Sequence, residues 1–169
     1  YKGILYAGIM KTTTGIYFLE FNCRFGDPEA QVLLNLLSDE TPLYNIIIDC
    51  IDGKNLNVKW KSGFCSNVVL SHNDYPYKKS ERLIPITISD DINKANEANE
   101  ANKLKMYWAN VIKHDDTDTY YTTGGRVVSI VSYSERFISS LTNIYNNIYK
   151  IFYDGIYYRR DIGYNYINR

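Results

Sequence analysis

The feature that most constrains the fold is an alternating segment near the start of the chain that leads directly into a helix signal. Apolar and polar side chains alternate from Leu19 to Arg24, and successive side chains of a β-strand point to opposite faces. Asp27 and Pro28 follow, a pair typical of a helix N-cap and the first helical position. An apolar stretch at residues 1–10 and a turn at 11–15 come before the alternation. We therefore predict a β-hairpin over residues 1–22 and then a helix.

The alternation also predicts how the polar groups of this strand are presented. Glu20, Asn22 and Arg24 share one face, whereas we expect the alternate positions to face the core, and these are Leu19, Phe21 and Cys23. Carboxylate and amide oxygens are ligands that Mg²⁺ prefers, and a guanidinium suits phosphate oxygens. A helix N-terminus directly after the strand also favours anions. A strand face that is simply solvated explains the same alternation, so the pattern alone leaves both interpretations open.

The rest of the chain reads as one more helix followed by a mostly β region. Pro42 and Gly53 bracket the helix, and the residues expected on its inward face are Leu43, Ile46, Ile47, Cys50 and Ile51. Short β-type segments are predicted at residues 56–60, 66–71, 82–88, 105–111 and 120–132. A helix then begins with Ser134 as N-cap, and its expected inward residues are Phe137, Ile138, Leu141, Ile144, Tyr145 and Ile148. An extended tail at 151–158 completes an α+β fold.

Composition excludes several functional classes. Lys+Arg and Asp+Glu both total 19, so the formal net charge is zero and gives no electrostatic reason to bind nucleic acid or an anionic membrane. No apolar run is long enough for a transmembrane helix. Cys23, Cys50 and Cys65 form no CxxC pair, which argues against a zinc site or a disulfide framework. We expect reduced, mostly buried thiols and a cytoplasmic location.

The segment at residues 93–103 repeats Asn, Glu, Lys and Ala and has no large apolar side chain to bury. It is predicted to be a low-complexity, solvated insertion in a loop.

A long contiguous motif adds information that the pattern alone does not carry. Residues 19–29 read Leu-Glu-Phe-Asn-Cys-Arg-Phe-Gly-Asp-Pro-Glu, which resembles the signature of phosphoribosylamine–glycine ligases, ATP-grasp enzymes of purine biosynthesis. Residues 1–10, 68–71, 75–76, 123–127 and 158–163 resemble further segments of the same family in the expected order. The resemblance covers nearly the whole chain apart from the insertion.

The resemblance implies an activity and a set of site residues. ATP would phosphorylate glycine to a glycyl phosphate, and the amine of 5-phosphoribosylamine would displace the phosphate to give 5′-phosphoribosyl-glycinamide, ADP and phosphate. By position in the motif, Glu20 and Asn22 match ligands of Mg²⁺ or Mn²⁺, and Arg24 matches a catalytic residue facing the reacting phosphate. The positions expected to contact substrate are Gly26, Asp27 and Arg126.

Some of these residues have an alternative structural role. Asp27 serves equally well as the helix N-cap. Gly124 and Gly125, just before Arg126, fit either a phosphate-binding backbone or a tight strand bend. Adjacent opposite charges favour an internal ion pair between Arg159 or Arg160 and Asp161. His72 and His114 have no partner at ligand spacing, and we expect both at the surface or in loops.

The family resemblance also predicts the domain organisation. Residues 1–53 would be the end of an ATP-grasp domain, and residues 54–169 a mainly antiparallel β C-terminal domain carrying one long helix. We expect the N-terminal substrate domain and the ATP-clamping lobe to lie upstream, so this chain alone should be inactive. The alternatives are another ATP-grasp carboxylate–amine ligase and a non-catalytic relic of the fold. The Arg-Phe-Gly-Asp-Pro-Glu continuation disfavours the first, and the intact Glu20, Asn22 and Arg24 disfavour the second.

Overall fold

The computed structural model describes residues 1–78, 82–92, 103–114, 117 and 119–167. The chain forms two compact units, Tyr1–Lys61 and Ser62–Arg169, and antiparallel strands with a few helices confirm the α+β fold class. The boundary predicted between residues 53 and 54 lies earlier than this division, and the assignment of the units to domains stays a prediction. The insertion at 93–103 falls outside the described residues except for Lys103.

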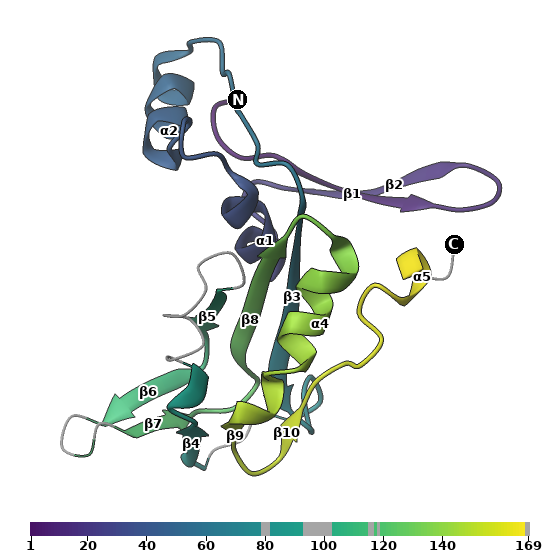
Figure 1. Ribbon diagram of the computed structural model, residues 1–169. Helices are drawn as coiled ribbons and strands as arrows, with labels where there is room; N and C mark the ends of the chain where they lie inside the picture. The colour runs from purple at the N-terminus through teal and green to yellow at the C-terminus, as the bar shows by residue number, and fades with distance from the viewer. Residues whose placement is uncertain (79–81, 93–102, 115–116, 118, 168–169) are drawn as a thin grey trace. The chain divides into compact units, whose positions relative to one another are not determined.

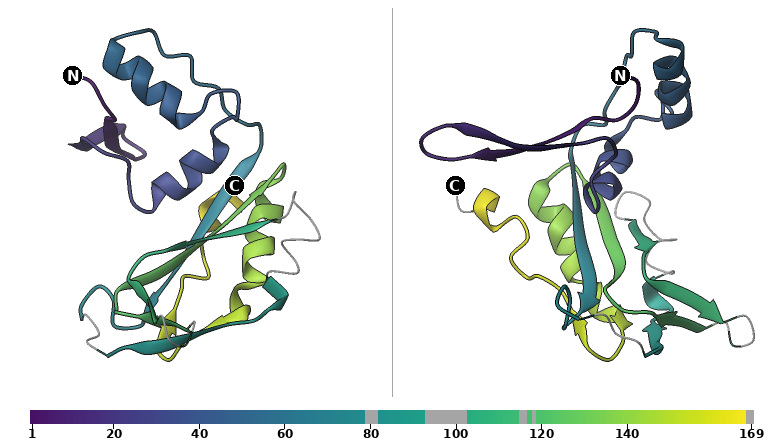
Figure 2. Two further views of the ribbon diagram at one scale, coloured as in Figure 1. Left: turned by 90° about the vertical axis from the view of Figure 1, so that its left-hand side faces the viewer. Right: turned by 180° about the vertical axis from the view of Figure 1, so that it is seen from behind.

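The first unit consists of a hairpin and two helices (Figure 1). Strands β1 (Tyr6–Lys11) and β2 (Ile16–Asn22) pair antiparallel, and Figure 2 shows them as a narrow two-stranded ribbon. The predicted hairpin is thus confirmed. Helices α1 (Glu29–Leu36) and α2 (Leu43–Asp52) follow. As predicted, α2 begins after Pro42 and ends at Gly53, whose φ of 72° gives the left-handed conformation that favours glycine.

The apolar side chains of this unit are more exposed than the sequence predicts. Leu19 and Phe21 were expected in the core but are 58% and 60% exposed, Cys23 is exposed, and no residue of α1 or α2 is buried. The expectation of an inward face was therefore wrong for both the strand and the helix. A single hairpin and two short helices offer too little opposing surface to cover one another.

Helix α1 begins differently from the prediction. The N-cap position is Pro28 rather than Asp27, and Pro28 itself makes no side-chain cap hydrogen bond. The backbone N–H of Ala30 donates to the Gly26 carbonyl at 2.9 Å. A backbone acceptor thus satisfies a first-turn donor that an Asp27 side chain would otherwise bind. The N-cap role predicted for Asp27 is therefore wrong.

The segment predicted as a strand at residues 56–60 forms only an isolated bridge between Leu37 and Trp60. Ser38 N–H donates to the Lys59 carbonyl at 3.0 Å, and Lys61 N–H donates to the Leu36 carbonyl at 2.7 Å. Backbone groups of this segment pair with the end of α1 instead of a sheet, so the strand prediction was wrong.

The described residues of the second unit form two four-stranded antiparallel sheets. The first has the order β10-β3-β8-β5, and its strands are β3 (Phe64–His72), β5 (Leu104–Trp108), β8 (Arg126–Ser134) and β10 (Ile156–Tyr157). The second has the order β6-β7-β4-β9, and its strands are β4 (Ile84–Ile88), β6 (Val111–His114), β7 (Thr119–Thr122) and β9 (Ile151–Phe152).

Two segments that the sequence predicts as single strands each pass from one sheet to the other. Residues 105–111 divide into β5 and β6, and residues 120–132 divide into β7 and β8. At this corner the Asn110 N–H donates to the Arg126 carbonyl, and Thr123 N–H donates to the Asn110 carbonyl at 2.9 Å. Gly124 and Gly125 have φ of 98° and 70°, which allows the chain to turn there.

Helix α4 (Phe137–Tyr145) packs on β3 and β8 (Figure 1). It is preceded by Arg136 as N-cap, so the N-cap predicted at Ser134 is wrong. Ser134 is the last residue of β8, and its hydroxyl accepts from Arg136 N–H at 3.4 Å. The 3-10 turn η2 (Ile148–Lys150) and helix α5 (Tyr164–Ile167) follow. Among the described residues, no helix has the length and apolar character needed to cross a membrane.

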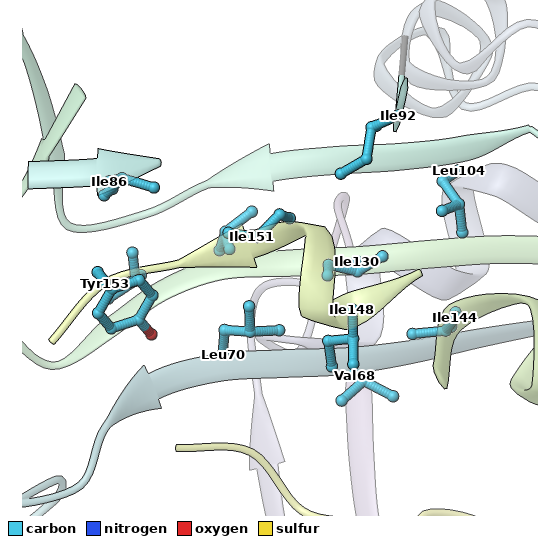
Figure 3. Packing of buried hydrophobic residues seen from close by; sticks show 12 residues of the cluster. Val68, Leu70, Ile86, Ile92, Leu104, Ile130, Ile144, Ile148, Ile151 and Tyr153 are labelled. Carbon is cyan, nitrogen blue, oxygen red and sulfur yellow. The ribbon is translucent and has the colours of Figure 1, made fainter. Parts of the chain in front are cut away.

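The core of the second unit is built by residues of both sheets, α4 and η2, and Figure 3 shows their side chains packed together. The buried side chains of this core include Val68, Leu70, Ile86, Val128, Ile130, Ile144, Ile148 and Ile151. Ile144 and Ile148 confirm the predicted inward face of this helical region, whereas Ile138 is 57% exposed and was placed inward wrongly.

Candidate functional site

Strand β2 presents the two predicted metal ligands side by side. The Asn22 side-chain nitrogen donates to Glu20 Oε1 at 2.9 Å. Glu20 is exposed and Asn22 is half-buried at the end of the strand. The structure thus places the carboxylate and the amide on one accessible face.

A β-bulge in the hairpin sets that face. Gly8 pairs with Glu20 and Ile9 pairs with Phe18, so Leu19 is the extra residue on β2. The rings of Phe18 and Phe21 lie 4.3 Å apart between centroids, although strict alternation would send positions three apart to opposite faces. The bulge reverses the alternation, so period two predicts the facing of side chains only from Glu20 onward.

Arg24 lies two residues beyond the end of β2, in a bend. Its side chain is exposed, and Nη1 donates to the Phe25 carbonyl at 2.9 Å. This bond holds the guanidinium against the loop between β2 and α1. Arg24 is therefore close to Asn22 along the chain but belongs to the loop rather than to the strand.

Gly26 and Glu29 form a second contact in the same loop. A Cβ on Gly26 would lie 2.5 Å from Glu29 Oε2, so the carboxylate occupies the space that a side chain would need. Tyr6 Oη also donates to Glu29 Oε1 at 3.4 Å. The sequence predicted a substrate contact for Gly26 and no role for Glu29. An acidic side chain in the first turn of a helix is stabilising, so the position of Glu29 in α1 already indicated a structural role.

The turn before Arg126 is built around a buried histidine. His72, only 4% exposed, lies with Nε2 2.9 Å from Thr122 Oγ1, and Gly124 N–H donates to the same hydroxyl at 3.0 Å. His72 N–H donates to the Gly125 carbonyl. The surface position predicted for His72 was wrong because its ring is the internal partner of this turn, whereas His114 is exposed as predicted.

The environment of His72 affects its protonation. Burial away from water disfavours the charged ring and lowers the pKa of His72, and the nearby carboxylates of Asp74 and Asp154 partly oppose this effect.

Because Gly124 N–H is already bound to Thr122, the structural interpretation of the Gly124–Gly125 turn has direct support. Arg126 begins β8 in this second unit, and its carbonyl accepts from Asn110 Nδ2 at 2.8 Å.

The arginines near the C-terminus are internally engaged. Arg159 donates from Nε and Nη2 to the two carboxylate oxygens of Asp161 at 2.8 and 2.6 Å. This bidentate pair confirms the predicted ion pairing and holds the pKa of Asp161 below its usual value. Arg160 lies over the Tyr158 ring at 5.7 Å from its centroid, a cation–π contact.

The cysteines do not form a site. All three are free, with Cys23 exposed and the other two intermediate, so the expectation that they are mostly buried was wrong. Burial raises the pKa of Cys65 to about 11, which keeps that thiol protonated at neutral pH.

The donor set on β2 fits a hard cation. No group of three or more His, Cys, Asp or Glu side chains suited to a metal occurs in the described part of the chain. Mg²⁺ does not need one, because it is commonly held by one or two protein oxygens together with water and substrate phosphates. Glu20 supplies a carboxylate and Asn22 an amide oxygen, and the 2.9 Å contact between the Asn22 amide nitrogen and Glu20 Oε1 shows that the two side chains are neighbours on β2.

Comparisons with known proteins identify the family. The model of the phosphoribosylglycinamide synthetase C domain matches residues 65–165, and the model of the ATP-grasp (A) domain of the same synthetase matches residues 1–30. The chain belongs to the phosphoribosylglycinamide synthetase family. The A-domain match contains Glu20, Asn22 and Arg24, and the C-domain match contains the turn at Gly124 and Gly125.

Individual relatives of the phosphoribosylglycinamide synthetase family align with almost all of the chain. A phosphoribosylamine–glycine ligase of Nostoc is 38% identical over 97% of the chain, and a bifunctional purine biosynthetic protein of Dictyostelium discoideum is 36% identical over 99%. The crystal structure of a phosphoribosylamine–glycine ligase from Thermotoga maritima superposes with a TM-score of 0.72 at 28% identity, covering 93% of the chain. The chain spans 37% of the Nostoc protein, 20% of the Dictyostelium protein and 36% of the Thermotoga chain.

Proposed function

We propose that this chain is the C-terminal part of a phosphoribosylamine–glycine ligase and carries part of its metal and phosphate site. The observation that carries the proposal is the Glu20–Asn22 contact of 2.9 Å on β2, within the residues that match the ATP-grasp domain. The family membership and the names of the relatives support the reaction class.

The proposed reaction has two steps. The glycine carboxylate attacks the γ-phosphorus of ATP, ADP leaves, and glycyl phosphate forms. The amine of 5-phosphoribosylamine then attacks the acyl carbon, phosphate leaves with the C–O electron pair, and the nitrogen loses a proton. Because the substrates supply both nucleophiles, the protein mainly needs to position them and stabilise charge on phosphate oxygens.

Each residue of the motif has a proposed role in that chemistry. Glu20 and Asn22 would hold Mg²⁺ or Mn²⁺, which neutralises phosphate charge when bound. Arg24 would direct its guanidinium to the transferring phosphoryl group, where a fixed cation stabilises charge that develops in the transition state. Gly26, Asp27 and Arg126 remain proposed substrate contacts.

The remaining parts of the enzyme would cover the apolar surface of the first unit. Ile9, Phe18 and Phe21 of the hairpin and Ile51 of α2 are all more than half exposed, a concentration typical of an interface. We propose that the N-terminal substrate domain and ATP-clamping lobe, which the longer relatives have room to contain, pack there and complete the ATP pocket. On this proposal the 169 residues alone have no turnover, and the parent enzyme acts in the cytoplasm.

The test uses the full-length enzyme that contains this chain. Purified enzyme should release ADP and phosphate only when glycine, 5-phosphoribosylamine and ATP are all supplied, and should form 5′-phosphoribosyl-glycinamide detectable by mass spectrometry. Another carboxylate or amine replacing these substrates at equal efficiency would favour a different ATP-grasp ligase. Mg²⁺–ATP binding without turnover of any carboxylate would favour the non-catalytic relic.

A further inference from the structure

A glycine lies directly across the hairpin from the proposed metal ligand Glu20. Gly8 of β1 pairs with Glu20 of β2, and the register slips by one residue immediately beyond this pair. Glycine weakens a strand interior, and where it occurs it often marks a bulge or a close approach of another group. Gly8 lies next to the bulge and is also closely approached by Glu20.

The close approach is measurable. A Cβ placed on Gly8 would lie 3.3 Å from Glu20 Cγ and 3.4 Å from the Glu20 carbonyl oxygen. The first distance is shorter than the normal separation of two carbon atoms. The stem of Glu20 therefore lies over the bare backbone of Gly8, and a Cβ at Gly8 would require Glu20 Cγ to shift by a few tenths of an ångström.

The bulge provides an independent constraint on the same side chain. Leu19 is the unpaired residue of β2, and the contact between Phe18 and Phe21 shows that the facing of side chains changes across it. Leu19 is 58% exposed, so its own side chain is not what holds the bulge. The backbone step at Leu19 sends Glu20 to the face that Asn22 shares.

We propose that Gly8 and the bulge at Leu19 together position the Glu20 carboxylate for metal binding, with Gly8 acting as a positioning residue that leaves space for the Glu20 stem. This rests on the proposed function of Glu20. A metal–ATP site requires its ligands to be held within about 0.5 Å of their productive geometry. A shift of a few tenths of an ångström at Cγ becomes larger at the carboxylate, which lies farther along the side chain. The carboxylate therefore reaches the limit of this tolerance.

The experiment measures Mn²⁺ binding directly. Full-length enzyme is titrated with Mn²⁺ in the presence of a non-hydrolysable ATP analogue, and free Mn²⁺ is counted by electron paramagnetic resonance. Gly8→Ala should raise the Kd for Mn²⁺ about tenfold, as changes that reorient metal ligands do. The matched control is Ala7→Val, which adds bulk to the adjacent exposed position of the same strand and should stay within about twofold of the parent.

A metal-free melting temperature and a second variant separate positioning from folding. Gly8→Ala should melt within a few degrees of Ala7→Val while differing from it in Kd. If Gly8→Ala fails to fold, Leu19→Gly decides, because glycine gives the backbone at the bulge more conformational freedom without adding atoms, and it should also weaken Mn²⁺ binding several-fold. The proposal would be overturned if a folded Gly8→Ala variant bound Mn²⁺ with the same Kd as the parent. If Gly8→Ala does not fold, the parent Kd in Leu19→Gly would overturn it.

Glu20→Gln separates this inference from the function on which it rests. If Glu20→Gln binds Mn²⁺ as the parent does, the metal role of Glu20 and the proposed site both fail. If Glu20→Gln loses binding but Gly8→Ala retains it, the site stands and only the positioning role fails.

Discussion

The side-chain nitrogen of Asn22 donates to Glu20 Oε1 at 2.9 Å. The two residues are separated by a single position in β2, so their contact depends on local strand geometry and on the bulge at Leu19. No distant element has to bring them together. The hydrogen bond directs the amide nitrogen, not the amide oxygen, toward Glu20, so joint binding of a metal ion by the two side chains requires the Asn22 amide to turn. A local pair of this kind brings the two proposed ligands together on β2.

Replacing Glu20 should affect metal use before it affects folding. In the full-length enzyme, Glu20→Gln should lower kcat and weaken the apparent Mg²⁺ affinity by roughly 10- to 100-fold, because a carboxylate ligand is lost while the strand is kept. Steady-state rates measured across a Mg²⁺ series check this. Glu40→Gln is the matched control, since Glu40 is an exposed acid of the same unit that pairs with Lys59 at 2.5 Å. Equal Mg²⁺ dependence in the two variants would contradict the assignment of Glu20 as a metal ligand.

Removing the Arg24 guanidinium should slow the chemical step. We expect Arg24→Ala to reduce kcat by about 10²–10³-fold, with a smaller change in the KM for ATP, because the cation acts on charge that develops during transfer. Single-turnover release of ADP measures the step. Arg160→Ala removes an exposed arginine that rests on Tyr158 and should leave the rate unchanged. A change confined to KM would assign Arg24 to ground-state binding instead.

The two isoleucines of α4 should differ sharply in their effect on stability. Ile144 is fully buried and Ile138 is 57% exposed, so Ile144→Ala should destabilise the second unit by about 2–5 kcal/mol and Ile138→Ala by less than about 0.5 kcal/mol. A Trp60→Phe background leaves Trp108, which stacks on Tyr120 in this unit, as the fluorescent reporter of urea unfolding. Similar midpoints for the two variants would contradict the observed packing of α4.

Stability of the second unit should fall as the solution is acidified past neutrality. Burial lowers the pKa of His72 in the folded state, so the unfolded chain binds a proton more readily, and stability rises with pH up to about pH 7.5. Below the unfolded pKa of about 6.5 this contribution is lost progressively. His72→Gln keeps a polar partner near Thr122 and removes the titration. Its unfolding free energy should therefore vary less between about pH 7.5 and 5.5 than that of the parent, as urea titrations at each pH would show.

The sequence by itself determined the local elements and the family. The hairpin and the helix between Pro42 and Gly53 follow from turn and cap chemistry that acts over a few residues. The motif at residues 19–29 identified the family, and its alternation placed Glu20 and Asn22 on one face. The pairing of Arg159 with Asp161 was also predictable, because two residues of opposite charge two positions apart need no distant partner.

Only the tertiary structure decided features that depend on contacts distant in sequence. The bulge at Leu19 appears only when β1 is aligned with β2, because a register is a property of two strands. Residues 120–132 divide between two sheets at a corner where Asn110 hydrogen-bonds to Thr123 and Arg126. His72 is buried with its ring against the Thr122 hydroxyl. Apolar periodicity in the first unit indicated which side chains could be buried, but burial requires an opposing surface that this unit does not provide. A sequence specifies such contacts only through the whole packed chain, which is why local patterns did not show them.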